Sequence, residues 1–479
     1  MMSRTRKVLR TLTVLIGATL AGCAVGPDYK GPPAAGDAKP NFARAPAGAS
    51  TESPASRWWT QLNDPLLSDL VERSLKANPS VDVAAARLRE ARAALSAERA
   101  KELPSTGASA AYLRAHGLTS ALGAVSEGDS GDTNIYAVGF DATWEIDLFG
   151  AHRRAVEGAA ASLEGSRASL RDVLVSLSSE VAQTYIQLRD AQERVHLTER
   201  NIEIDRRQLE IMKRRRAGGT ASDLDLARLG NQLDTAQASL GPLRTEVIEQ
   251  MDKLCFLTGN AAGALDQELT PAAGVPLPPE IVAIGDPARL VRQRPDIAAA
   301  ERRLAAQTAA IGQDIAALFP KLTLLGDVGF TAPTPRTLFN GSSFTYVAAP
   351  LLQWTPFDFG RNKARIEQAR SSRDEAEADY RRTVLVALQD AESALNRFGK
   401  QRNTVGDYAN AKISAERAYS LTEIRLRAGT ASTTDLLDAD LKQLQAQLSY
   451  EQAVAQLSID FVAIQKSLGL GWDYLNTGP

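Results

Sequence analysis

The sequence predicts a mainly helical protein that is internally duplicated and carries four membrane-type β-strands. Residues 153–217 and 361–427 contain no proline, and the first stretch, if fully helical, would extend for about 97 Å, longer than a globular core. Apolar residues recur every seven positions along both stretches, which is the spacing of a left-handed coiled coil. Shorter segments between the helical ones alternate apolar with small or polar residues, as strands with two different faces do.

The N-terminus has the pattern of a secretory lipoprotein signal. Basic residues precede an apolar run that ends at Leu20 and is too short to span a membrane. The run leads into Leu20-Ala21-Gly22-Cys23, which resembles the bacterial lipobox. We therefore expect a signal peptide at 1–22 and a mature chain that begins at Cys23 with a covalent lipid. Ala24 rather than aspartate follows, which in such lipoproteins indicates the outer membrane. The alternative is an unmodified cysteine in an ordinary signal peptide.

The rest of the chain contains the same pattern twice. Short motifs recur in one order at a nearly constant spacing, and they pair Pro79 with Pro295, Trp144 with Trp354, Gly150 with Gly360 and Gly218 with Gly429. The sequence therefore predicts a first repeat at 79–258 and a second at 295–470. The remaining segments are 23–78 at the lipidated N-terminus, a proline- and glycine-rich connector at 259–294, and a C-terminal tail at 471–479.

In each repeat the sequence predicts a helix, two strands, a very long helix and a final helix. In the first repeat these are 79–103, ended by Pro104, then 105–115, 135–145, 153–217 and 222–258, with a kink expected at Gly241-Pro242. In the second repeat they are 295–318, 321–331, 343–354, 361–427 and 432–468. Within the first long helix, the seven-residue row comprises Leu174, Val181, Leu188, Val195, Ile202 and Leu209.

The strand at 135–145 shows the alternation most clearly. Tyr136, Phe140 and Trp144 fall on its apolar face, and small or polar residues fall on the other. Its length of roughly 10 residues suits a tilted membrane strand, and Tyr346 and Trp354 stand where interfacial aromatic residues would lie. Four strands would leave two edges whose backbone groups lipid cannot satisfy, so membrane insertion would require several copies. A soluble hairpin that caps a coiled coil is the alternative.

Composition argues against several other classes of protein. The formal net charge is −2 and no extended basic segment is present, so nucleic acid is not an expected partner. Two cysteines and three scattered histidines offer no metal-ligand spacing, and the common catalytic motifs are absent. We therefore expect no enzyme activity and no cofactor apart from the lipid on Cys23. Cys255 is expected to be a small packed residue in the last helix of the first repeat.

Several motifs together resemble TolC-type outer-membrane factors, in the lipoprotein branch of OprM and NodT. They are Gly26-Pro27-Asp28-Tyr29, Trp58-Trp59, Leu62-Asn63-Asp64-Pro65-Leu66 at the opening of the first helix, the Phe-Gly pairs before the long helices, and Arg427-Ala428-Gly429-Thr430 leading to Asp435-Leu436-Leu437-Asp438-Ala439. The resemblance implies a homotrimer in the outer membrane of a Gram-negative bacterium. It would combine a twelve-stranded β-barrel with a twelve-helix periplasmic α-barrel, and segment 23–78 would make contacts at the equator of the tube.

The same resemblance implies a function and partners. The trimer would act with a periplasmic adaptor protein and an inner-membrane resistance-nodulation-division pump to export drugs or other toxic small molecules. Two alternatives remain open. One is an exit duct for type I protein secretion, and the other is a non-conducting lipoprotein scaffold tethered to the outer membrane.

The resemblance also places a periplasmic gate at the turn that precedes the last helix. Asp435 and Asp438 are three residues apart, hence on one helix face, and would form stacked carboxylate rings in a trimer. Thr434 replaces a leucine that narrows the pore in OprM-like members, so a weaker apolar seal is expected. Leu426 stands where the family often has an aromatic residue, and Ala431 stands where TolC itself has an arginine. The resemblance therefore does not predict whether side chains at these two positions hold the gate closed. The alternative is an ordinary solvated helix start capped by Ser432 or Thr433.

Overall fold

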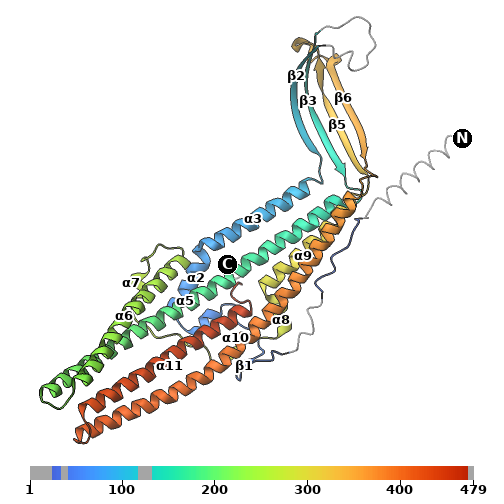
Figure 1. The fold of residues 1–479 in the computed structure, drawn as a ribbon. Helices are drawn as coiled ribbons and strands as arrows, with labels where there is room; N and C mark the ends of the chain where they lie inside the picture. Colours follow the sequence, from blue (N-terminus) through green and yellow to red (C-terminus); the bar gives the residue numbers. More distant parts are fainter. Residues whose placement is uncertain (1–23, 34–40, 117–131, 473–479) are drawn as a thin grey trace. The chain divides into compact units, whose positions relative to one another are not determined.

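The computed structural model describes residues 24–33, 41–116 and 132–472 (Figure 1). Both repeats contain the expected order of elements. In the first they are α3 (Pro79–Ala100), β2 (Ser105–His116), β3 (Asp132–Ile146), α5 (Ala151–Ala217) and α6 (Asp223–Leu257). In the second they are α9 (Pro295–Ala316), β5 (Lys321–Ala332), β6 (Phe344–Gln353), α10 (Arg361–Arg427) and α11 (Thr433–Ser467). The long helices have 67 residues each and the final helices 35 each, which confirms the repeated plan. The signal peptide at 1–22, Cys23 and most of the tail lie outside the described residues.

Shorter elements fill the segments before and between the repeats. They are β1 (Ala49–Ser50), η1 (Trp58–Leu62), α2 (Pro65–Ala77), α7 (Asp266–Leu269), β4 (Val282–Ala283), α8 (Pro287–Gln293), η2 (Pro335–Thr337) and η3 (Gly341–Ser343). The motif at 62–66 opens α2, the first described α-helix, as expected, and α3 then begins the repeat. Pro79 disfavours helical geometry at Asn78, whose ψ is 127°, so α2 and α3 are separate helices.

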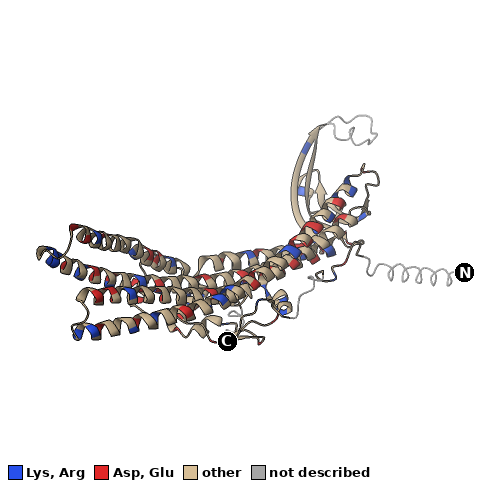
Figure 2. Cartoon of the chain, turned by 60° about the horizontal axis from the view of Figure 1, so that its bottom comes forward, with Lys and Arg blue, Asp and Glu red and all other residues tan. Residues whose placement is uncertain are grey.

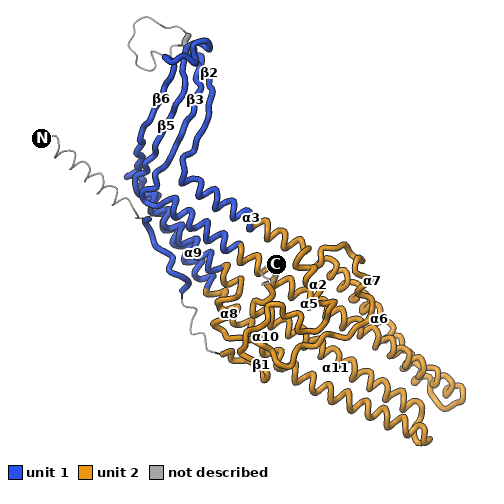
Figure 3. The backbone as a smooth tube through the Cα atoms, turned by 180° about the vertical axis from the view of Figure 1, so that it is seen from behind, with its two compact units in different colours: residues 1–33, 88–166, 300–380 blue, residues 34–87, 167–299, 381–479 orange. Residues whose placement is uncertain are grey.

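The chain forms two compact units, coloured in Figure 3, and the long helices contribute residues to both. Unit 1 comprises residues 1–33, 88–166 and 300–380 and contains the four-stranded antiparallel sheet, in the order β2-β3-β5-β6. Glycine pairs with glycine at the centre of this sheet, where Gly139 of β3 lies opposite Gly329 of β5. Each of the edge strands β2 and β6 pairs on one side only. The four strands expected from the alternation are therefore confirmed, and they form a single sheet.

Unit 2 comprises residues 34–87, 167–299 and 381–479, and its helices pack as two hairpins. Leu197 and Ile204 of α5 form a buried cluster with Leu437 and Leu444 of α11. The residues contributed by each helix are seven apart, as in a coiled-coil seam. α6 is joined to α5 by ion pairs from Arg244 to Glu199 (2.7 Å) and Lys253 to Glu180 (3.0 Å), and α10 is joined to α11 by a hydrogen bond from Gln401 to the Ala453 carbonyl. The four helices thus lie in the order α6, α5, α11, α10.

The predicted heptad row contributes to the core of unit 2. Leu174, Val181 and Leu188 have no exposed surface, and Ile202 is also buried. The N-terminal segment packs onto the same unit through the completely buried Trp58, whose ring lies edge to face against Phe461. Tyr185 of α5 donates a hydrogen bond to the Asp64 carboxylate (2.7 Å) at the start of α2. Cys255 is buried and unpaired, as expected for a packed residue.

Pro242 lies inside α6, which continues unbroken from Asp223 to Leu257. Proline has no N–H, so the carbonyl of Ala238, one turn earlier, has no helical donor. Both residues are exposed, and water can therefore satisfy that carbonyl. The proline consequently does not end the helix.

Candidate functional site

The turns between each long helix and the following helix have the same geometry in both repeats. Gly219 and Gly429 adopt left-handed conformations, with φ values of 75° and 73°. The amide of Thr220 donates to the Arg215 carbonyl (2.8 Å), and the amide of Thr430 donates to that of Arg425 (2.9 Å). This is the hydrogen-bond pattern of a glycine-terminated helix, in which a side chain at the glycine would be strained. The turns lie where the glycines predict them, but the structural equivalent of Gly429 is Gly219 and not Gly218, which the motif pairs with it.

Asp435 takes part in a capping box at the start of α11. The Ser432 amide and hydroxyl donate to its carboxylate (2.7 and 2.8 Å), and the Asp435 amide donates to the Ser432 hydroxyl (3.1 Å). These hydrogen bonds, first from the backbone and then from the side chain of Ser432, hold the pKa of Asp435 below its ordinary value. Ser432 is therefore the helix cap, as the ordinary reading of the motif predicts. The carboxylate remains exposed while it caps the helix.

Asp438 and Thr434 lie on the same first two turns of α11. Asp438 is exposed, and its carboxylate accepts a hydrogen bond from the side-chain amide of Gln208 in α5 (3.1 Å). Thr434 is partly buried. The next acidic residue, Asp440, pairs with Arg200 of α5 (3.1 Å). Asp435 and Asp438 therefore present their carboxylates near the surface of the helix start, whereas Asp440 is neutralised against α5.

The equivalent turn of the first repeat carries a different charge pattern. Its capping box is formed by Ser222 and Asp225, with a hydrogen bond of 3.1 Å from the Ser222 amide to the carboxylate. Arg228 stands three residues after Asp225, at the position that corresponds to Asp438. Arg216 also pairs with Asp223 at this turn (2.6 Å). Only the second of the two described turns therefore carries two acidic residues on one face of its helix start.

The cap of the first repeat allows a test of this local geometry. Ser222→Ala should accelerate hydrogen exchange of the first-turn amides of α6 about fivefold at pH 7, because a helix cap contributes about 1 kcal/mol. The pKa of Asp225 is held below 3.8 by Ser222. Its stabilising effect is thus present above that value and is lost as the pH falls through the lowered pKa. After correction for intrinsic exchange, wild-type protection should persist at pH 5, and its loss there would contradict the assignment.

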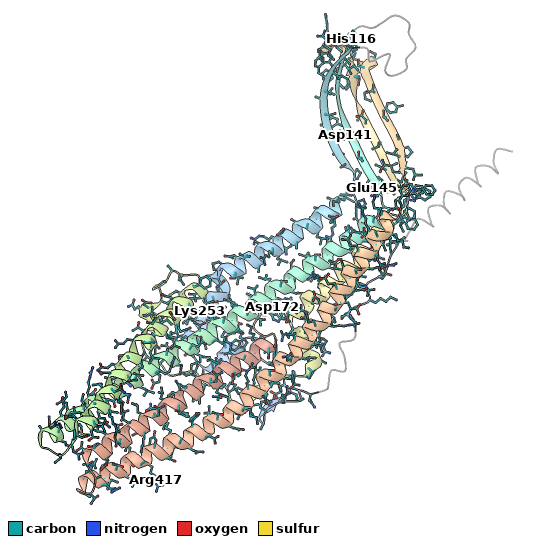
Figure 4. All side chains as sticks on the ribbon, viewed as in Figure 1. His116, Asp141, Glu145, Asp172, Lys253 and Arg417 are labelled. Carbon is teal, nitrogen blue, oxygen red and sulfur yellow. The ribbon has the colours of Figure 1, made fainter. Side chains whose placement is uncertain are left out.

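The two faces of the sheet in unit 1 differ in chemistry. One face presents large apolar residues, including Phe140, Val328 and Tyr346, which are directly adjacent on neighbouring strands and exposed. The other face presents mainly small and polar residues, with Asp141 of β3 opposite Asp327 of β5, and it also carries the exposed Leu325, Val347 and Leu351. Figure 4 shows Asp141 partway along β3 and Glu145 near its end. Figure 2 shows few charged residues on the strands and many along the helices. The sheet thus has one face suited to lipid and one suited to water.

On the face that carries Asp141 and Asp327, Gly107, Gly139 and Gly329 each lie very close to a neighbouring strand. A Cβ atom on Gly329 would lie 2.4 Å from the Val138 carbonyl oxygen and 2.7 Å from the Gly139 Cα. A Cβ on Gly107 of β2 would lie 2.7 Å from the Asp141 carboxylate. The backbones and side chains on this face therefore approach too closely for larger residues, as on the concave side of a curved sheet. Sequence alternation indicates the two faces, but it does not show which glycines meet.

The outer helices of unit 2 carry exposed apolar side chains. On α6 these include Ile248 and Phe256, and on α10 they include Ile413, Leu421 and Ile424, all more than half exposed. Ile248 also lines a largely apolar groove between α5 and α6. Surface helices that lack further partners normally present charged residues there. Both ends of the four-helix row are therefore suited to contact with another helix.

Two searches of the described residues bear on other kinds of site. Among the described helices, none combines the length and apolar character required to cross a membrane. Within the same residues, no three His, Cys, Asp or Glu side chains gather in an arrangement able to hold a metal ion.

Comparison with known proteins agrees with this architecture. The family model for outer membrane efflux proteins matches residues 70–260 and 287–470. The chain is 31% identical to the pyoverdine export outer membrane protein OpmQ of Pseudomonas putida, over 92% of this chain and 94% of that protein. It is 26% identical to nodulation protein T of Rhizobium leguminosarum bv. trifolii, over 97% and 98% of the respective chains. The solved structure of the outer-membrane channel OprN superposes with a TM-score of 0.86 at 34% identity, and the match covers 94% of this chain and 100% of that one. The chain therefore belongs to the outer membrane efflux protein family.

Proposed function

We propose that the chain is one of three identical subunits of an outer-membrane exit duct for drugs or other toxic small molecules. The observation that carries this proposal is the open sheet, which has an apolar face, a polar face and two unpaired edges, β2 and β6. Backbone groups at an edge cannot remain unpaired in lipid, so the sheet must close with copies of itself. Three copies would supply twelve strands, enough for a barrel with a water-filled interior.

The helices of unit 2 support the same assembly. Apolar side chains on α6 and α10, at the two ends of the helix row, would be covered if α6 of one subunit packed against α10 of the next. Three four-helix rows would then close into a periplasmic barrel. In such a tube the small and polar face of the sheet, with Asp141 and Asp327, would line the lumen, where polar surfaces let solutes pass without binding tightly.

The acidic start of α11 is the proposed periplasmic gate. Three copies of Asp435 and Asp438 would place six carboxylates around the axis, where mutual repulsion raises their pKa values and attracts cations. Thr434 would contribute a weaker apolar seal than a leucine. The gate would open when a periplasmic adaptor and an inner-membrane resistance-nodulation-division pump dock. Selection of the exported compound would rest mainly with the pump, and the chain itself would catalyse no reaction and bind no cofactor besides the lipid on Cys23.

The proposal is tested by single-channel conductance in planar bilayers, with the oligomer mass measured on the same detergent-solubilised sample. We expect a trimer that gives small, cation-selective currents. A monomer or dimer that conducts no ions would overturn the duct and favour a lipoprotein scaffold. Drug susceptibility of a deletion strain would separate drug export from type I protein secretion, since only the former predicts hypersensitivity that the cloned protein reverses.

A further inference from the structure

The first described residues of the chain are held by one buried arginine of unit 1. Arg154, in the first turn of α5, is 4% exposed. Its guanidinium donates to the carbonyls of Val25 (3.2 Å) and Gly26 (3.3 Å) and to the carboxylate of Asp28 (2.7 Å). It also pairs with Glu157 on its own helix (2.7 Å). A charged, planar group with several aligned donors is well suited to fix a short extended segment, because each donor restrains a different residue.

Two glycines make room for this contact. Gly26 has a φ of 96°, and a Cβ there would lie 2.5 Å from the Cα of Gly312 in α9. A Cβ on Gly312 would in turn lie 2.8 Å from the side chain of Arg154. The Val25 amide donates to the Phe149 carbonyl (3.1 Å), and the Tyr29 hydroxyl donates to Glu301 (3.1 Å). Residues 25–29 are thus fixed at both ends, and we call this set of contacts the N-terminal clamp.

The internal duplication provides a comparison for the clamp. The position in α10 that corresponds to Arg154 is Ala364, and the position in α3 that corresponds to Gly312 is Ser96. The chain has one N-terminal segment, and only one of the two equivalent places carries the arginine and the glycine. Neither residue is therefore required by the repeated fold itself. Both are explained by the segment that they hold.

Aromatic residues surround the same region of unit 1, where the strands meet the helices. Trp144 donates its indole N–H to the Glu102 carbonyl (2.9 Å), and Trp354 donates to that of Leu318 (3.0 Å). The backbone carbonyl of Phe149 accepts the hydrogen bond from the Val25 amide. The ring of Phe149 stacks on that of Phe319, with 4.5 Å between the ring centroids. Tryptophan side chains that combine a hydrogen-bonding N–H with an apolar ring are typical of the membrane–water interface. The clamp consequently holds the chain beside residues suited to the edge of a bilayer.

We propose that Arg154 is a positioning residue for the lipid anchor, holding the chain so that acyl groups on Cys23 enter the membrane leaflet beside the aromatic residues at the base of the sheet. This inference rests on the lipidation and membrane insertion given under the proposed function. Cys23 stands two residues before Val25, the first residue that the clamp holds, so the covalent chain keeps the two Cα atoms within about 7 Å of each other. Acyl chains and sheet would then form one continuous anchor. Without the clamp, the lipid would be attached to a loose segment and would add much less to the stability of the sheet.

The test uses the full-length protein purified from outer membranes, with acylation of Cys23 verified by mass. Hydrogen exchange is measured on the peptide that covers residues 24–33. Arg154→Ala should accelerate exchange of the Val25 amide at least about tenfold, since that amide would lose its fixed acceptor geometry. Asp28→Asn should act in the same direction and cannot disturb the helices, because Asp28 lies in the segment itself and is exposed. Arg153→Ala is the matched control, as Arg153 contacts Asp147 instead of the segment.

The second readout separates anchoring from simple packing. The unfolding temperature in lipid vesicles is compared for each variant with and without the lipid, the unlipidated form being Cys23→Ser behind a cleavable secretory signal. The lipid should raise the unfolding temperature of the wild type and of Arg153→Ala by similar amounts. In Arg154→Ala and Asp28→Asn the increase should be roughly half as large or less. An arginine that only stabilised the fold would not change the effect of the lipid in this way. Unchanged exchange in both clamp variants, equal lipid effects throughout, or an unmodified Cys23 would overturn the proposal. A wild-type protein that shows the coupling but forms no conducting trimer would refute the duct alone.

Discussion

Replacing Gly329 with alanine is expected to prevent most of the protein from reaching a heat-resistant assembled form in the outer membrane. Gly329 lies opposite Gly139 in the central strand pair, and a Cβ atom there would lie 2.4 Å from the Val138 carbonyl oxygen. The atoms that this Cβ would meet, the Val138 carbonyl oxygen and the Gly139 Cα, both belong to the backbone, so no neighbouring side chain can move away to make room. Relieving the overlap would separate β3 from β5, at a cost of about 2–3 kcal/mol per chain. In a closed barrel that cost would be incurred by every subunit.

The matched control is Gly326→Ala, three residues away on the same strand. A Cβ there would meet the Ala142 Cβ at 3.8 Å, which is ordinary contact, on the apolar face of the sheet. Its effect should stay within roughly 0.5 kcal/mol. The measurement is the fraction of outer-membrane protein that migrates as an oligomer on gels as the sample temperature is raised. Equal heat resistance of the two variants would show that the close approach of Gly139 and Gly329 does not control closure of the sheet.

Local sequence signals were sufficient to predict most of the elements. Proline and glycine mark the ends of the long helices, and the bounds of α10 agree with the predicted 361–427 because Gly360 stands directly before the helix and Gly429 two residues after its end. The alternation in 135–145 predicted β3 and its two faces. The capping of α11 by Ser432 was also among the readings that the sequence left open. In each case the physical cause acts within a few residues of the signal.

Contacts between distant residues could not be predicted in the same way. The approach of Gly139 to Gly329 depends on how β3 pairs with β5, and the clamp joins Arg154 to Asp28 across more than a hundred residues. The predicted seven-residue row of α5 includes Ile202, whereas α11 packs against Leu197 and Ile204, which belong to a neighbouring row that the pattern did not single out. Nor did the pattern reveal that Asp327 lies beside Asp141. Such pairs are determined by strand register and helix packing, and neither can be read from local patterns in a single sequence.

Removal of both carboxylates from the proposed gate is expected to raise single-channel conductance several-fold and to reduce cation selectivity. The double variant is Asp435→Ala with Asp438→Ala. A ring of like charges attracts cations and binds counterions at the constriction, so its loss should leave a wider and less selective opening. The measurement is conductance in planar bilayers, together with the reversal potential in a salt gradient.

The two aspartates have different local roles, which makes the single variants informative. Asp435 also completes the cap of α11, so a change in its variant could come from a frayed helix start. Asp225→Ala is the matched control, because it removes the same cap from α6 at a turn where Arg228 replaces the second aspartate. We expect little change in that control, whereas Asp438→Ala should raise conductance without loss of a cap. Thr434→Leu should act in the opposite direction by narrowing the same opening. Asp438→Ala channels that conduct no better than wild type would place the constriction elsewhere along the tube.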